Sequence, residues 1–161
     1  YNNRQNVQKK GIFNEPSDSL EEWSNCINLF LLFATRPDYI ATQRMKPDKY
    51  GRYGYQKSRR LMPELYQPAF MYSHVRGRLT FGFYQIDGDD KVRWICFDID
   101  DHKGLRGSEE VKADVCSVLN VLKKYTIPFM LESSGSQNSY HIWIFLEPTR
   151  TYNAFRFARQ I

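Results

Sequence analysis

The stretch RWICFDIDDH, residues 93–102, places carboxylates directly after a run of large apolar residues. Side chains two apart on a strand project from the same face, so Asp98 and Asp100 are expected to share a face, with Ile99 on the other. Two carboxylates on one rigid edge repel each other unless a cation lies between them. Such hard oxygen ligands suit Mg²⁺ or Mn²⁺, especially where substrate phosphates complete the coordination shell. The structural alternative is a simple turn, because Asp is common in the turns that follow strands.

A second group of polar residues lies in SSGSQNSYHIWIF, residues 133–145. A Gly/Ser-rich loop between two strands offers backbone N–H groups and hydroxyls to an anion such as a triphosphate. Ser139 and His141 are two apart at the start of the next strand, and a His can donate to a phosphate oxygen when its other ring nitrogen is held. A turn followed by a surface His is the alternative when this segment is considered alone. Together with Asp98 and Asp100, it favours a site for a metal-bound nucleotide.

The elements that must position these groups follow from hydrophobic periodicity and turn signals. We predict a helix that Ser19 and Glu22 cap and that ends before Pro37, and a helix that Ser108 caps, over residues 107–125. Residues 70–77 are predicted to form a short helix or turn, and a further helix follows Pro148. The predicted strands are residues 78–86 and 92–99, joined as a hairpin through the turn DGDD, and then 127–133 and 140–147.

This order predicts an α+β fold in two lobes. Residues 1–18 are interpreted as a flexible arm and residues 19–161 as one catalytic core. Within that core, residues 19–86 form an N-terminal lobe with a long basic loop, and residues 87–161 form a β-α-β-β lobe.

Charge favours a polyanionic partner, because the chain carries a formal net charge of +5 and has a pI of about 9.1. The segment KPDKYGRYGYQKSRR, residues 46–60, holds six Lys or Arg residues against one Asp, interleaved with three Tyr residues. Cations beside flat rings are typical of surfaces that bind single-stranded nucleic acid. We predict that Lys57, Arg59 and Arg60 contact phosphates, with Arg76 as a further candidate. The alternative is a solvated loop.

Cysteine usage and hydropathy indicate a cytoplasmic protein. Cys26, Cys96 and Cys116 are far apart and lie among apolar residues, so they are predicted to be reduced core cysteines, and no Cys/His cluster indicates zinc. No apolar run approaches the roughly 20 residues of a membrane helix, and the N-terminal residues do not resemble a signal peptide. A membrane partner is therefore not expected.

The segments FDIDDH and LESSGSQNSYHIWIFLEP resemble the catalytic signature of the archaeo-eukaryotic primase superfamily, the primase-polymerases. The first motif of that family, Asp-x-Asp after an apolar strand, is matched by Asp98 and Asp100. The second, a small residue two before a His that enters a strand, is matched by Ser139 and His141. The surrounding residues resemble the branch found in plasmids, viruses, defence systems and CRISPR-associated loci. The similarity covers roughly residues 27–161.

This resemblance implies a two-lobed catalytic core with one RRM-like lobe, and template-directed nucleotidyl transfer in the cleft between the lobes. It implies that Asp98 and Asp100 hold Mg²⁺ or Mn²⁺. The residues implied to grip the triphosphate are Ser134, Ser136, Ser139 and His141. The implied partners are nucleoside triphosphates, a single-stranded nucleic-acid template, and helicase or defence-system proteins.

One departure from the family concerns its third motif, which supplies another carboxylate from a later strand. Asp101 and Glu132 are poor substitutes by position, since Asp101 alternates to the opposite strand face and Glu132 lies at a strand end before the loop. We therefore expect a chain truncated at its C-terminal end, with an incomplete RRM-like lobe.

Two other functions remain open from the sequence. The first is a metal-dependent phosphohydrolase with an Asp nucleophile, although His102 stands where such enzymes usually have a small hydroxyl residue. The second is a non-catalytic single-stranded nucleic-acid-binding module, although the chain has no RNP-type aromatic motif.

Overall fold

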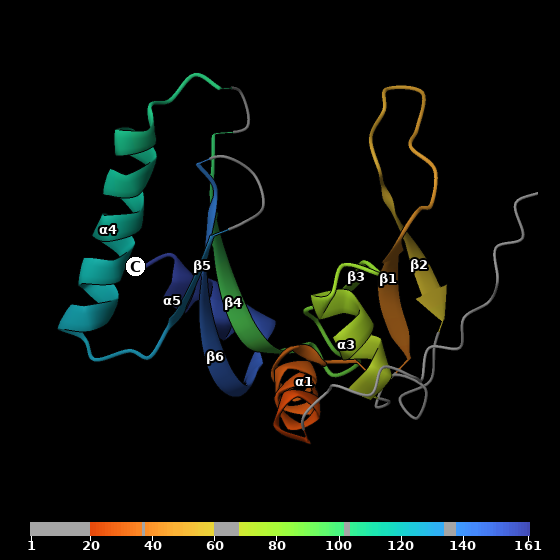
Figure 1. Cartoon of the computed structure of the whole chain (residues 1–161). Coiled ribbons are helices and arrows are strands. Elements are labelled where there is room, and N and C mark those ends of the chain that lie inside the picture. Colours follow the sequence, from red (N-terminus) through yellow and green to blue (C-terminus); the bar gives the residue numbers. More distant parts are fainter. Residues whose placement is uncertain (1–19, 37, 60–67, 102–103, 134–137) are drawn as a thin grey trace, which may run out of the picture.

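The computed structural model describes residues 20–36, 38–59, 68–101, 104–133 and 138–161. These residues form an α+β fold with two antiparallel sheets of three strands each, in agreement with the predicted fold class (Figure 1). In chain order the elements are α1 (Leu20–Phe33), β1 (Tyr39–Gln43), β2 (Tyr55–Arg59), α3 (Pro68–Val75), β3 (Phe81–Phe83), β4 (Lys91–Ile99), α4 (Ser108–Lys124), β5 (Met130–Ser133), β6 (Tyr140–Arg150) and α5 (Thr151–Ala158). The predicted arm, residues 1–18, and the predicted cap Ser19 lie outside the described residues.

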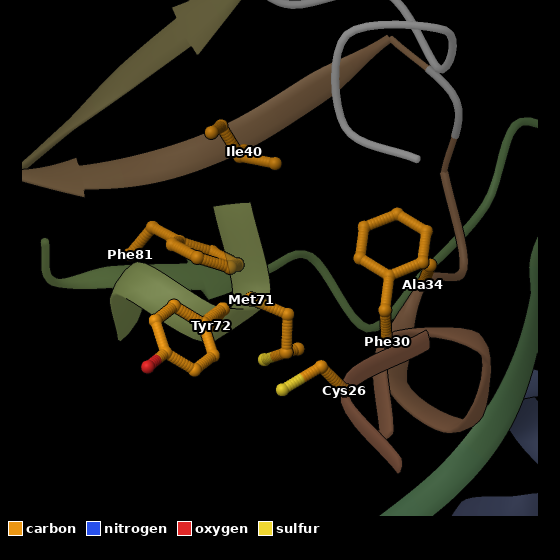
Figure 2. Packing of buried hydrophobic residues seen from close by; sticks show 7 residues of the cluster. All are labelled: Cys26, Phe30, Ala34, Ile40, Met71, Tyr72 and Phe81. Atoms are coloured by element: carbon orange, nitrogen blue, oxygen red, sulfur yellow. The ribbon is translucent and has the colours of Figure 1, made fainter. Parts of the chain in front are cut away.

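The first lobe consists of α1, α3 and a sheet in the order β2-β1-β3. Its core contains buried residues from both helices, from β1 and β3, and from the residue after α1. They converge in Figure 2: Cys26, Phe30, Ala34, Ile40, Met71, Tyr72 and Phe81. Ile40, in the central strand, is completely buried. Burial of these side chains, worth about 25 cal/mol per Å² of apolar surface, holds the two helices on one face of this sheet.

The prediction of a long basic loop is partly wrong. Residues 55–59 form β2, which pairs antiparallel with β1, so the basic segment is one side of a β-hairpin whose loop spans residues 44–54. Figure 1 shows this hairpin projecting beyond the rest of the first lobe. Lys57 pairs with Ala41 and therefore faces away from Ile40 and the core. The basic composition hid the strand, because Ile40 is the only buried residue of β1 and no described side chain of β2 belongs to the core.

The prediction that residues 78–86 and 92–99 form a hairpin is also wrong. Only Phe81–Phe83 forms a strand, and it pairs with β1 in the first sheet rather than with β4. The reason is burial, because the Phe81 ring is 5% exposed in the first-lobe core while β4 contributes to a separate core. The DGDD turn is present, and the Asp87 carboxylate accepts hydrogen bonds from the backbone N–H groups of Asp89 and Lys91. It joins two sheets instead of two strands of one sheet.

The second lobe has the order β4-α4-β5-β6-α5, with β6 between β4 and β5 in the sheet. β4 and β5 both run antiparallel to β6, so they are parallel to each other. The core side of this sheet packs against α4 and α5 through Ile95, Val115, Leu122, Ile142 and Ile144. This is the predicted RRM-like β-α-β-β arrangement. Figure 1 shows α4 on one side of the sheet and the first lobe on the other.

The predicted cap of α4 needs a correction. The helix begins at Ser108, so Gly107 is the N-cap residue and Ser108 is inside the first turn. The Glu110 carboxylate accepts a hydrogen bond from the backbone N–H of Gly107 at 3.3 Å, which is one half of a capping box. The predicted apolar face is confirmed, since Val111, Val115 and Leu122 are buried.

An aromatic cluster joins α1 of the first lobe to the second sheet. The Phe33 ring contacts the rings of Trp143, Phe145 and Trp94 at centroid distances of 4.9, 5.3 and 6.1 Å. The Trp94 indole N–H also donates to the backbone carbonyl of Phe33 at 3.2 Å. The end of α1 is therefore anchored on the sheet face opposite α4, because Trp94 alternates with the core residue Ile95.

The cysteine prediction holds only in part. All three thiols are free, but only Cys26 is a core residue, while Cys96 is half-buried and Cys116 is exposed. None of the helices in the described part of the chain has the length and apolar character that crossing a bilayer requires.

Replacing Phe33 by Ala should lower the free energy of unfolding by about 2 kcal/mol. The expected loss is below the ~3–5 kcal/mol of a fully buried Phe, because Phe33 is only partly buried. Leu32→Ala, one position earlier and 43% exposed, is the control and should cost less than about 1 kcal/mol. Denaturant unfolding of both variants measures the difference, and equal losses would mean that the aromatic cluster does not hold α1 on the sheet.

Candidate nucleotide and metal site

The open face of the second sheet carries three polar side chains in one row. Asp98 on β4 pairs with His141 on β6, and His141 pairs with Glu132 on β5. Asp98 lies between Phe97 and Ile99, which pack in the core beside α4, so its own side chain projects from the opposite face. Neighbouring strands lie about 4.8 Å apart, which brings each carboxylate within reach of the imidazole between them.

Asp98 and His141 make the central contact of the site. The Nε2 atom of His141 lies 3.6 Å from Oδ1 of Asp98, which is ion-pair range but longer than a hydrogen bond. The His141 side chain is 28% exposed and that of Asp98 58% exposed, so an incoming ligand can reach both. The two sequence motifs, separated by a helix and a strand, are thus brought together on one face of the sheet.

The two acids after Asp98 have different surroundings. Asp100 directly follows the last residue of β4 and is partly buried. Asp101 stabilises the following loop, because its carboxylate accepts hydrogen bonds from the backbone N–H groups of Leu105 at 2.9 Å and Arg106 at 3.0 Å. Both carboxylate oxygens of Asp101 are thus engaged by the backbone of the loop.

The donor set at the tip of β4 fits a hard divalent cation that keeps part of its water shell. Asp98 offers an accessible carboxylate and Asp100 a second one two residues later. No group of three or more His, Cys, Asp or Glu side chains among the described residues has an arrangement that could hold a metal ion by itself. Mg²⁺ does not need such a cage, because it is commonly bound through one or two carboxylates together with substrate phosphates and water.

Glu132 belongs to this site, and the sequence did not reveal its position. Its Oε2 atom lies 3.1 Å from Nδ1 of His141 and accepts a hydrogen bond from the indole N–H of Trp143 at 2.8 Å. We expected only a strand end before a loop. The register of the hairpin places it: because Ser133 pairs with Tyr140, Glu132 lies opposite His141 on the same face. A sequence pattern could have revealed this only if that pairing had been assumed.

Cys96 lies on the same face, one alternation before Asp98. Burial, together with the charges of Asp98 and Glu132, raises the pKa of the Cys96 thiol to about 12. The thiol therefore stays protonated at neutral pH, which makes it a poor nucleophile and a poor metal ligand. The chemistry of this face is left to its oxygen and imidazole groups.

The loop that follows β5 is only partly described. Ser134 and Ser136 lie outside the described residues. Ser139, directly before β6, is 5% exposed, so a ligand can reach this residue only after some rearrangement. Asn138 has a φ of 58°, a left-handed conformation that Asn tolerates and that turns the chain into β6.

The candidate nucleic-acid residues lie on the first lobe. Lys57 is exposed on the outer face of β2, and its ammonium lies 3.5 Å from the centroid of the Tyr39 ring. Arg59 belongs to β2, but its side chain lies outside the described residues, as does all of Arg60. Arg76 makes an ion pair with Glu22 at 2.6 Å, which neutralises part of its charge. Sequence reasoning did not anticipate this ion pair.

The hairpin loop and the first residue of β2 add exposed aromatic surface to this lobe. Tyr50, Tyr53 and Tyr55 are 68%, 52% and 51% exposed. Lys49 and Arg52 both lie near the Tyr50 ring, at 4.9 and 5.1 Å from its centroid. Exposed rings with adjacent cations can stack on bases and contact phosphates at the same time.

Comparison with protein families identifies the family of the chain. Residues 26–161 match the model of the archaeo-eukaryotic primase domain of TOTE conflict systems. No curated protein matches the chain significantly. The matched segment covers most of the chain and contains both motifs, Asp98 with Asp100 and Ser139 with His141. The chain therefore belongs to the archaeo-eukaryotic primase superfamily, within the branch of the TOTE conflict systems.

Proposed function

We propose that this domain is a primase-polymerase that transfers nucleotides from nucleoside triphosphates to a growing strand, directed by a single-stranded template. The observation that carries the proposal is the pairing of Asp98 with His141 on an open sheet face, with 3.6 Å between Oδ1 and Nε2. A cation bound to the carboxylate and a phosphate bound to the imidazole would then be neighbours. Membership of the primase superfamily supports this assignment.

The proposed roles follow from the chemistry of each group. Asp98 and Asp100 would hold Mg²⁺ or Mn²⁺, which when bound supplies positive charge to the reacting phosphate oxygens. His141 would donate from Nε2 to an oxygen of the incoming triphosphate, with Ser134, Ser136 and Ser139 as further proposed contacts. The 3′-hydroxyl of a primer, or of a first nucleotide, would attack the α-phosphate and release pyrophosphate. The protein contributes mainly position, because it holds these groups on paired strands of one sheet.

Template binding is assigned to the first lobe. Lys57 is exposed on the outer face of the β1–β2 hairpin, and the exposed Tyr rings of its loop lie nearby in the chain. Arg59 and Arg60 continue the basic segment. Arg76 is proposed as a weaker contact, because binding a phosphate would have to compete with its ion pair to Glu22.

A nucleotide-incorporation assay tests the proposal against the two alternatives. Primed template, labelled nucleoside triphosphate and Mg²⁺ or Mn²⁺ should give extended strands. Phosphate release without extension would favour a phosphohydrolase, and template binding that is independent of metal and nucleotide would favour a non-catalytic binding module.

Asp98→Asn and Asp100→Asn should each lower incorporation by at least about 100-fold. The amide keeps the size of the side chain but removes the charge that attracts a divalent cation. Asp89→Asn, an exposed carboxylate in the DGDD turn, is the matched control and should leave incorporation unchanged. Retention of most activity in either site variant, with an unchanged melting temperature, would end the assignment of the metal ligands.

His141→Ala should raise the KM for the incoming nucleotide about tenfold or more, while the affinity for template stays the same. The imidazole is assigned to the triphosphate and lies on the second sheet, whereas the template surface lies on the first lobe. His141→Gln, whose amide can reach the position of Nε2, should recover part of the loss. Steady-state kinetics and template anisotropy measure the two quantities separately, and an equal loss of both would contradict the assignment.

Replacing Lys57, Arg59 and Arg60 together by Gln should lower the affinity for single-stranded nucleic acid and flatten its salt dependence. Each lost phosphate contact reduces the slope of log K against log salt by roughly 0.7 on a single strand. Replacing Lys123, Lys124 and Arg156, which are exposed on α4 and α5, removes the same charge from the other lobe and should leave the slope nearly unchanged. Equal slopes for the two triple variants would mean that only net charge matters.

A further inference from the structure

We infer that Glu132 is a positioning residue that holds the His141 ring with Nε2 directed toward Asp98. The inference rests on the proposed role of His141 and assigns a function to a carboxylate outside both sequence motifs. It starts from the row of cross-strand partners Asp98, His141 and Glu132 on three adjacent strands.

The contacts of Glu132 determine which ring nitrogen is held. An ionised carboxylate only accepts hydrogen bonds, so the contact of 3.1 Å between its Oε2 and Nδ1 of His141 requires the proton on Nδ1. Nε2 then lies on the Asp98 side, 3.6 Å from Oδ1. A neutral imidazole has a single N–H, so Nε2 donates to a triphosphate oxygen only when the ring carries a second proton. A hydrogen bond at one imidazole nitrogen fixes the orientation of the ring and the position of its proton, and so determines how the other nitrogen meets a ligand.

A second donor holds the carboxylate itself. The indole N–H of Trp143 donates to the same Oε2 atom at 2.8 Å, and the Trp143 ring packs against Phe33 at the end of α1. Trp143 also lies on β6, two residues after His141, so it projects from the same face. A continuous set of contacts thus runs from α1 of the first lobe through Trp143 and Glu132 to His141.

The geometry argues against Glu132 as a direct metal ligand. Asp98 and Glu132 lie on strands separated by β6, so their backbones are about 9.6 Å apart, twice the ~4.8 Å strand spacing, with the imidazole between them. Oxygen atoms that share one Mg²⁺ each lie about 2.0–2.1 Å from it. The position of Glu132 beyond His141 therefore fits a residue that acts through the ring.

The first experiment is a double-mutant cycle in the natural protein. Glu132→Gln should raise the KM for nucleotide about tenfold with a smaller change in kcat. Trp143→Phe, which keeps an aromatic side chain but lacks the indole N–H, should raise it less. In a His141→Ala background, Glu132→Gln should have no further effect, because its influence passes through the ring. Glu147→Gln, an exposed carboxylate on the same strand as His141, is the control and should change nothing. Additive losses in the double variant would overturn the inference.

The second experiment does not depend on catalysis. Nitrogen NMR of the imidazole rings should show His141 protonated at Nδ1 in the wild type and a loss of that preference in Glu132→Gln, with an unchanged melting temperature. An unchanged tautomer would overturn the inference. If wild type fails to incorporate nucleotide but shows the Glu132-dependent tautomer, the proposed function fails while the positioning role is supported.

Discussion

The pairing of β4 with β6 is the constraint on which the site depends. It sets Asp98 opposite His141, and it is maintained by burial of Ile95, Ile142 and Ile144 against the two helices of the second lobe. A slip of one residue would turn every side chain of a strand to the other face, which would bury the carboxylate and expose isoleucines. The hydrophobic core therefore specifies the register, and the register places the polar groups. Apolar packing on one face of the sheet thus fixes the positions of the polar side chains on the other face.

The open face of the same sheet is divided between two uses. Near the end of α1, Trp94, Trp143 and Phe145 pack around Phe33 and join the two lobes. Near the end of β4 and the start of β6, the face carries Asp98 and His141 and is accessible. Trp143 takes part in both regions, since its ring packs on Phe33 and its N–H binds Glu132. A change in the position of the first lobe on this sheet would therefore alter the hydrogen bonds of the site.

The first lobe brings a different kind of surface. Its sheet buries one face through Ile40 and Phe81, and the other face of the β1–β2 pair carries Lys57 beside Tyr39. A cation over an aromatic ring keeps its charge, and exposed rings beside cations are typical of surfaces that bind single-stranded nucleic acid. The proposed template binding rests on this surface, where exposed cations are interleaved with Tyr side chains. By contrast, Arg76 of this lobe forms an ion pair with Glu22 and therefore has a partly structural role.

Local patterns in the sequence were enough to determine the α+β class, the long amphipathic helix α4 and the strands that carry the two motifs. Alternation alone placed Asp98 on the face opposite Phe97 and Ile99, because the period of two is a property of any strand. The strand β2 and the partner of β3 could not be read in this way. Which strands pair depends on contacts between residues far apart in the chain, such as Phe81 with the core around Ile40, and local composition does not encode them. The same reason hid Glu132: its place beside His141 follows from the β5–β6 register, and only the tertiary structure, by closing that hairpin on the core of the second lobe, brought its carboxylate to the ring.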